Sequence, residues 1–124
     1  MLYEELTEKI IGAAYNVYDK MGYGYLESVY EKCMKIELDK VGLYCEFQYP
    51  IKVSYDGHEV GNFIADIIVN DMIIVELKSA IAVHKSHEVQ LVNYLVSTGK
   101  KIGLLINFGP EKVEIKRKHK SVCM

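Results

Sequence analysis

The chain has 124 residues, half of them apolar and 26% charged, which fits one soluble globular domain over residues 1–124. No apolar run approaches the roughly 20 residues of a membrane helix, and the acidic N-terminus does not resemble a secretory signal, so we expect a cytoplasmic protein without a membrane partner. Residues 1–76 carry 14 acidic and 6 basic side chains, whereas residues 77–124 carry 3 acidic and 9 basic ones. The basic second half permits an anionic partner, although folding can equally mix the two halves.

Two helices are predicted before the first strand. Apolar residues recur at helical spacing over residues 3–21, and the sequence MGYGY then interrupts the pattern. A second helix is predicted from about Tyr25 to Val41, because Gly42 is a natural residue to follow the last helical turn.

Glu27 lies within the apolar stripe of this second helix, flanked by Met34 and Leu38. We therefore expect its carboxylate to point inward or along the edge of the core. Helix capping is the alternative, because with Gly24 as N-cap Glu27 would occupy the third helical position and could bond back to the cap.

Three strands follow, joined by two turns. Alternating residues over 45–55 predict a strand with one solvated face, and Pro50 within it indicates a sheet edge or a bulge. An Asp-Gly pair at positions 56 and 57 is a strong hairpin signal that leads into a second strand over 59–69. An Asn-Asp pair then turns the chain into a third strand over 72–78.

One helix and two strands are predicted in the rest of the chain. The segment 86–99 has helical periodicity and ends on Gly99. The segment 102–109, IGLLINFG, is apolar on both faces and predicts a central buried strand, and 112–118 predicts a final alternating one. The order α-α-β-β-β-α-β-β predicts an α+β (α/β) fold in which helices flank a mixed sheet.

Three ionisable residues stand at the ends of two otherwise apolar strands. Asp66 interrupts one strand, and Glu76 and Lys78 lie two apart on the next, so they share a face. Carboxylates buried side by side repel each other unless a cation such as Mg²⁺, which prefers oxygen ligands, lies between them. The pattern indicates metal-assisted phosphodiester hydrolysis, with a surface ion pair as the alternative explanation.

The turn between these strands decides whether the two carboxylates can meet. A two-residue loop at Asn70-Asp71 would place Asp66 and Glu76 on opposite faces of the sheet. A three-residue loop that also contains Met72, or a single bulge, would place them on the same face. We expect one of these two irregularities, and a regular two-residue hairpin would exclude a shared metal.

A ridge of polar residues is predicted on the third helix. His87, Gln90 and Tyr94 fall within about 60° of one another around the helix axis. They could therefore face the acidic residues together, although the ridge taken alone favours the alternative of Tyr94 in the core with His87 and Gln90 at its rim.

Two further signals concern cofactors and partners. Cys33, Cys45 and Cys123 are odd in number and match no metal-binding spacing, so we expect no iron–sulfur cluster. The ten tyrosines permit an aromatic homodimer interface and equally fill a small core.

These motifs together resemble the GxxExxY family, which belongs to the PD-(D/E)XK nuclease-like superfamily. The resemblance covers about residues 5–118. It rests on Gly24-x-x-Glu27-x-x-Tyr30, Asp66, Glu76-x-Lys78, His87, Gln90-x-x-x-Tyr94 and the sequence GLLINFG from Gly103 to Gly109.

The resemblance implies a restriction-endonuclease-like core with a defined metal site. It makes Asp66 and Glu76 ligands of Mg²⁺ or Mn²⁺, with the backbone carbonyl of Leu77 completing the shell. It assigns Lys78 as the catalytic lysine, and Glu27 as the acidic metal ligand that the first core helix contributes.

The resemblance also implies a branch and a substrate class. Gln90 and Tyr94 match the QxxxY motif of RecB-like and lambda-exonuclease-like nucleases, in which the motif positions the site and the nucleic acid. We therefore predict a metal-dependent nuclease acting on DNA rather than RNA. The alternatives are a nuclease-fold module that binds nucleic acid, or a protein-interaction module, without turnover.

Basic residues near the third helix and the last strand are the predicted phosphate contacts. A solvated terminal tail is the alternative for those in the sequence KRKHK. The predicted contacts are Lys85, His87, Lys116, Arg117 and Lys118.

Overall fold

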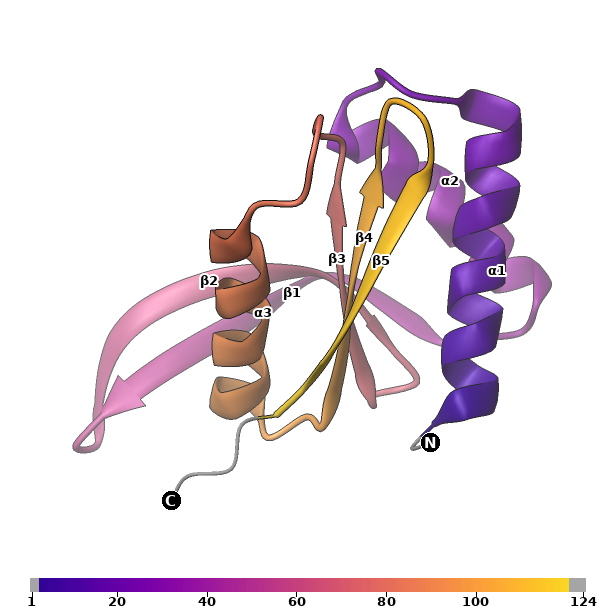
Figure 1. Cartoon of the computed structure of the whole chain (residues 1–124). Coiled ribbons are helices and arrows are strands. Elements are labelled where there is room, and N and C mark those ends of the chain that lie inside the picture. Colours follow the sequence, from indigo (N-terminus) through magenta and orange to yellow (C-terminus); the bar gives the residue numbers. More distant parts are fainter. Residues whose placement is uncertain (1–2, 121–124) are drawn as a thin grey trace.

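The computed structural model describes residues 3–120 and has three helices packed on a five-stranded sheet (Figure 1). The order of elements and the α+β class are those predicted. In chain order the elements are α1 (Glu4–Met21), α2 (Glu27–Lys40), β1 (Cys45–Tyr55), β2 (His58–Val69), β3 (Ile73–Lys78), α3 (Lys85–Thr98), β4 (Ile102–Phe108) and β5 (Val113–His119).

The sheet follows the chain order, β1-β2-β3-β4-β5. Neighbouring strands are antiparallel except for β3 and β4, which run parallel. A parallel pair requires a crossover connection, and α3 is that crossover. Pro50 lies on β1 at the sheet edge, where a missing N–H donor is tolerated.

Helices cover both faces of the central strands. Figure 1 shows α1 and α2 on one face and α3 on the other. On β3, Ile73 and Val75 pack into the core beneath α1 and α2, whereas Ile74 packs with Leu91 of α3. Because side chains alternate along a strand, Glu76 projects on the same face as Ile74, towards α3. Both faces being covered explains why β4 is buried along its whole length.

The outer halves of β1 and β2 form a two-stranded ribbon that extends past α3 (Figure 1). The side chains of β1 switch from one face of the sheet to the other at Gln48, which has a left-handed φ of 54°. Phe47 before it packs under α1 and α2, but Tyr49 after it packs with the α3 core, although alternation would put them on the same side. Gln48 lies between the pairs Phe47–Ile67 and Tyr49–Ala65, at the level of Asp66.

Most expected boundaries hold to within two residues, and the start of the second helix is the clearest difference. The helix begins at Glu27, with Leu26 rather than Gly24 as N-cap. Gly24 has a φ of 113°, which a residue with a side chain rarely adopts, so it bends the approach to the helix instead of capping it. Within residues 3–120, no helix has both the length and the apolar character needed to cross a membrane.

Candidate functional site

The β2–β3 hairpin has the three-residue loop that a shared carboxylate site requires. Val69 pairs with Ile73 and Ile67 pairs with Val75, which leaves Asn70, Asp71 and Met72 in the loop. Asn70 and Asp71 both have left-handed φ angles, a conformation that Asn and Asp tolerate better than most residues. The predicted irregularity is therefore confirmed.

This register brings Asp66 opposite Glu76 at the end of the hairpin ladder. Asp66 Oδ2 accepts a hydrogen bond of 2.7 Å from the backbone N–H of Leu77. The Asp66 carboxyl group also acts on the carboxyl group of Glu76, whose pKa it raises. The two side chains, one from each strand, thus share a single site on the face that α3 covers.

Burial gives Glu76 an unusual protonation state. The side chain is 6% exposed, and burial raises its pKa to about 9, with the hydrogen bond and the charge of Asp66 adding to the effect. The Lys78 ammonium opposes the shift. At neutral pH the Glu76 carboxyl therefore stays protonated, which removes the repulsion between two like charges at short range.

One oxygen of this pair has no protein partner. Glu76 Oε1 is buried, and it accepts no hydrogen bond from any residue in the range 3–120. Burying an oxygen without a partner costs free energy of folding. A divalent cation bound between the two carboxyl groups would supply that partner. Asp66 and Glu76 are oxygen donors of the type that Mg²⁺ and Mn²⁺ take, so the residues present fit such an ion.

Lys78 completes the group on β3. It lies two residues beyond Glu76, half-buried, and pairs across the ladder with Asn107 of β4. Its positive charge opposes the rise in the pKa of Glu76 and, after burial, helps to lower the pKa of His87.

Glu27 differs from its predicted orientation. It is exposed rather than facing the core, because it is the first residue of α2 and burial begins only at Tyr30, one turn later. No group of three His, Cys, Asp or Glu side chains that could hold a metal occurs within residues 3–120, so Glu27 stands apart from the acid pair. Its charge nevertheless acts on His87, and it lines a hollow of about 360 Å³ together with Ser79.

The capping alternative for Glu27 is also absent from the described structure. Neither Glu27 nor the N-cap Leu26 makes a side-chain capping bond among residues 3–120. The carboxylate is therefore free of local partners at the same end of the sheet as Lys78.

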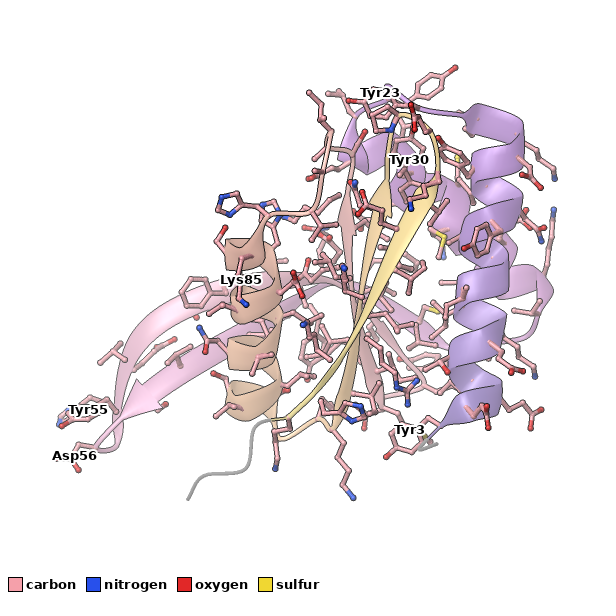
Figure 2. The ribbon with its side chains drawn as sticks, viewed as in Figure 1. Tyr3, Tyr23, Tyr30, Tyr55, Asp56 and Lys85 are labelled. Carbon is pink, nitrogen blue, oxygen red and sulfur yellow. The ribbon has the colours of Figure 1, made fainter. Side chains whose placement is uncertain are left out.

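Tyr30 fixes the loop that leads to Glu27. Its hydroxyl donates to the carbonyl of Gly22 and accepts from the backbone N–H of Tyr25, at 3.5 Å. Its ring stacks on Phe108 of β4, with 4.2 Å between ring centroids. The Ser79 hydroxyl donates to the carbonyl of Tyr25 at 2.8 Å, so the loop is tied to the ends of both β3 and β4. Figure 2 shows Tyr30 beneath this loop, with Tyr23 outside it.

The three residues of the predicted α3 ridge have different environments. Tyr94 is buried in one cluster with Ala65 and Ile74, and the pKa of its hydroxyl is raised by burial and then by the charges of Glu76 and Asp66. Gln90 is exposed, one turn earlier. His87 is half-buried, and burial together with Lys78 lowers its pKa.

His87 also has a structural role in starting α3. Its Nδ1 accepts from the backbone N–H of His84 at 3.4 Å, and His84 Nδ1 accepts from the N–H of Ser86 at 3.2 Å. These reciprocal bonds form a capping box made of two histidines.

The predicted phosphate contacts separate into two groups. Lys118 forms an ion pair with Glu88 of α3 at 2.6 Å, and Lys116 and Lys85 also lower the pKa of that glutamate. Arg117 instead lies on the opposite face of β5, where it donates to the Thr7 hydroxyl at 3.1 Å. The alternation of β5 thus gathers the lysines near α3 and directs the arginine to α1.

Asn107 is a site residue to which the sequence analysis gave no role. It is fully buried, and its amide both accepts from the N–H of Ala80 at 2.9 Å and donates to the Ala80 carbonyl at 3.0 Å. It therefore fixes the chain just after Lys78. The available signal was a lone polar residue within an apolar strand, which needs a buried partner.

The sheet, its helices and the acid pair with a neighbouring lysine define a class of nuclease-like domains. The chain belongs to the PD-(D/E)XK nuclease superfamily, whose family model matches residues 4–118. This match is to the superfamily, and the GxxExxY resemblance stays a prediction.

A solved structure shares the fold. The crystal structure of SSO0001 aligns over 98% of this chain with a TM-score of 0.64 and 16% identity. This chain spans 61% of the length of that one, and at such low identity the likeness concerns the fold alone. No curated protein matches the chain.

Proposed function

We propose that this protein is a Mg²⁺- or Mn²⁺-dependent nuclease that hydrolyses phosphodiester bonds of nucleic acid, with DNA as the expected substrate. Membership of the superfamily supports a nuclease-like function. The observation that carries the proposal is the Asp66–Glu76 pair, in which the buried Glu76 has a raised pKa and its Oε1 has no partner among residues 3–120.

Each residue near the pair has a distinct proposed role. Asp66, Glu76 and the Leu77 carbonyl hold the cation, which when bound would polarise the phosphate and lower the pKa of a coordinated water. Lys78 orients the attacking water and stabilises the negative charge that develops on the phosphate. Tyr94 and Gln90 position the substrate, and Glu27 contributes from the rim through water, since it stands apart from the pair.

Binding without turnover is the second candidate. The exposed position of Glu27, outside any three-residue acidic cluster among the described residues, favours it. Metal binding is common to both candidates, so cleavage separates them.

The proposal is tested by measuring metal binding and cleavage in the same variants. Calorimetry with Mn²⁺ is expected to show one site that Asp66→Asn and Glu76→Gln each abolish. Single-stranded DNA, duplex DNA and RNA are then incubated with Mg²⁺ or Mn²⁺. We expect Lys78→Ala to lower cleavage by about 10²–10³-fold while Mn²⁺ still binds.

Lys9→Ala is the matched control, because Lys9 is an exposed lysine on α1 whose recorded ion pair is with Glu5. It should cleave like the wild type. Equal cleavage by Lys78→Ala would attribute the activity to a contaminant. Absence of Mn²⁺ binding at millimolar concentration would rule out both candidates.

A further inference from the structure

A groove of about 730 Å³ runs between α3 and the β1–β2 ribbon. The ribbon contributes Val53 and Phe63, and α3 contributes Val89, Asn93 and Tyr94. Figure 2 places Lys85 at the start of α3, with the ribbon tip at Tyr55 and Asp56 extending past the helix. The volume lies within the range of about 300–1,000 Å³ that small-molecule sites occupy.

The walls of the groove combine an aromatic surface with free amides. The rings of Phe63 and Tyr94 lie 5.8 Å apart between centroids, and Phe63 is 43% exposed. The side-chain amides of Gln90 and Asn93 also line the groove, and neither bonds to another residue within 3–120. A flat apolar face beside unpaired hydrogen-bonding groups suits a planar heterocycle with polar edges.

The groove is continuous with the candidate site. Tyr94 lines the groove, and it also packs in one buried cluster with Ala65, which precedes Asp66, and Ile74, which shares a strand face with Glu76. A nucleotide whose phosphate reaches the acid pair would therefore have its base at the groove. Lys85, the first residue of α3, also belongs to the groove lining and supplies a positive charge for a neighbouring phosphate.

We propose that this groove binds an unstacked nucleobase, so that the substrate is a single-stranded nucleic acid. This inference rests on the proposed nuclease function and specifies its substrate. Phe63 supplies the stacking surface, Gln90 and Asn93 contact the base edge, and Lys85 contacts the backbone. Bases in a duplex are stacked and paired, and extruding one costs a few kcal/mol, which disfavours duplex.

The test measures binding in EDTA, where no metal-dependent cleavage occurs. Fluorescence anisotropy compares a thymidine oligonucleotide of about 12 nucleotides, its duplex, and an abasic oligonucleotide of equal length. We expect the base-bearing single strand to bind at least about 10-fold more tightly than the other two. Phe63→Ala should weaken that binding by about 5–100-fold and bring it to the abasic level.

Ile64→Ala is the matched control, since Ile64 is the adjacent ribbon residue and is 56% exposed. It should bind like the wild type. Asn93→Ala, at an exposed position without a partner among residues 3–120, tests the groove independently of any folding defect in the Phe63 variant. Lys85→Ala should weaken all three oligonucleotides alike and reduce the salt dependence by about one counterion.

The groove proposal and the nuclease proposal fail in different ways. Equal affinity for the abasic and thymidine strands, or wild-type binding by both Phe63→Ala and Asn93→Ala, overturns the groove while leaving cleavage intact. A dimer that Phe63→Ala converts to a monomer, with oligonucleotide binding unchanged, assigns the groove to a second copy and also overturns the proposal. Base-dependent binding without cleavage in Mg²⁺ or Mn²⁺ overturns the nuclease function and supports the groove.

Discussion

At the scale of single residues, the site depends on the protonation state of Glu76. Burial leaves this carboxyl group protonated well above the pH at which an exposed glutamate ionises. Cation binding at the pair must then displace that proton, so affinity for Mn²⁺ should rise with pH.

Glu76→Gln should stabilise the metal-free protein at high pH. The pKa is raised from 4.5 to about 9, so the folded state binds a proton that the unfolded chain releases, and the stability of the wild type falls as pH rises from about 4.5 to 9. Glutamine stays neutral and removes this dependence. Chemical denaturation in EDTA should show a gain of about 1–3 kcal/mol at pH 8 and little difference at pH 4. A parallel decline of both proteins between pH 5 and 9 would contradict the assigned pKa.

Asn107→Leu should destabilise the protein by about 1–3 kcal/mol, because it leaves the N–H and carbonyl of the partly buried Ala80 without their partners. Urea denaturation measures the loss, and hydrogen exchange should show faster exchange at the Ala80 amide. Asn93→Leu, at an exposed position of α3, serves as control and should change stability by less than about 0.5 kcal/mol.

At the scale of elements, two contacts hold the helices against the ends of the strands. One is the Tyr30 hydroxyl, which anchors the loop before α2. The other is the close approach of α3 to β4 at Gly103, where a Cβ would stand 2.8 Å from Leu91 Cδ1.

Tyr30→Phe should lower cleavage more than it lowers stability. The ring still stacks on Phe108, so we expect a loss of only about 1 kcal/mol from the missing hydroxyl, while the loop that presents Glu27 loses an anchor. Tyr15→Phe is the control, because it removes a hydroxyl from a tyrosine that is 47% exposed. Urea denaturation and cleavage rates are measured for both variants. Identical cleavage by both variants would remove the link between this anchor and activity.

Gly103→Ala should destabilise the protein by about 1–3 kcal/mol, since the added methyl group forces Leu91 and α3 away from β4. Gly12→Ala is the opposite case. Nothing lies within 4 Å of a Cβ at that position in α1, so alanine should stabilise the helix by about 0.5–1 kcal/mol. Thermal denaturation should show a lower Tm for Gly103→Ala and a higher Tm for Gly12→Ala. Destabilisation of similar size in both variants would contradict the packing argument.

At the scale of the whole molecule, the cation and the fold are thermodynamically linked. A ligand that binds only the folded state stabilises it by about 2.7 kcal/mol at a concentration 100 times its Kd. Adding Mn²⁺ at neutral pH should therefore raise the Tm of the wild type and leave that of Glu76→Gln unchanged. An equal rise in both would indicate that Mn²⁺ binds elsewhere.

Much of this fold could be predicted from local patterns. Helical periodicity and glycine ends located the helices, and the apolar run of residues 102–109 identified a strand buried on both faces. The Asp-Gly turn before β2 has the left-handed φ angles, 54° and 80°, that its sequence favours. These features depend on neighbouring residues, which is why the sequence alone reveals them.

The candidate site could be predicted only in part. A site shared by Asp66 and Glu76 required either a three-residue loop or a bulge in the second hairpin. Only the strand register showed that the loop has three residues. For Glu27 the helical pattern was misleading, because a residue in the first turn can follow the apolar stripe and still extend beyond the core. The hydrogen bonds of Asn107 to Ala80 join residues 27 apart, which no local pattern encodes.

The sequence by itself determined the elements, their order and the acids and lysine of the site, because periodicity and charge are local properties of a chain. Tertiary structure decided that burial beside Asp66 raises the pKa of Glu76, that Arg117 turns away from the lysines of β5, and that a groove opens beside Tyr94. Each of these depends on burial and on distances between segments remote in sequence, and both arise only when the helices close on the sheet.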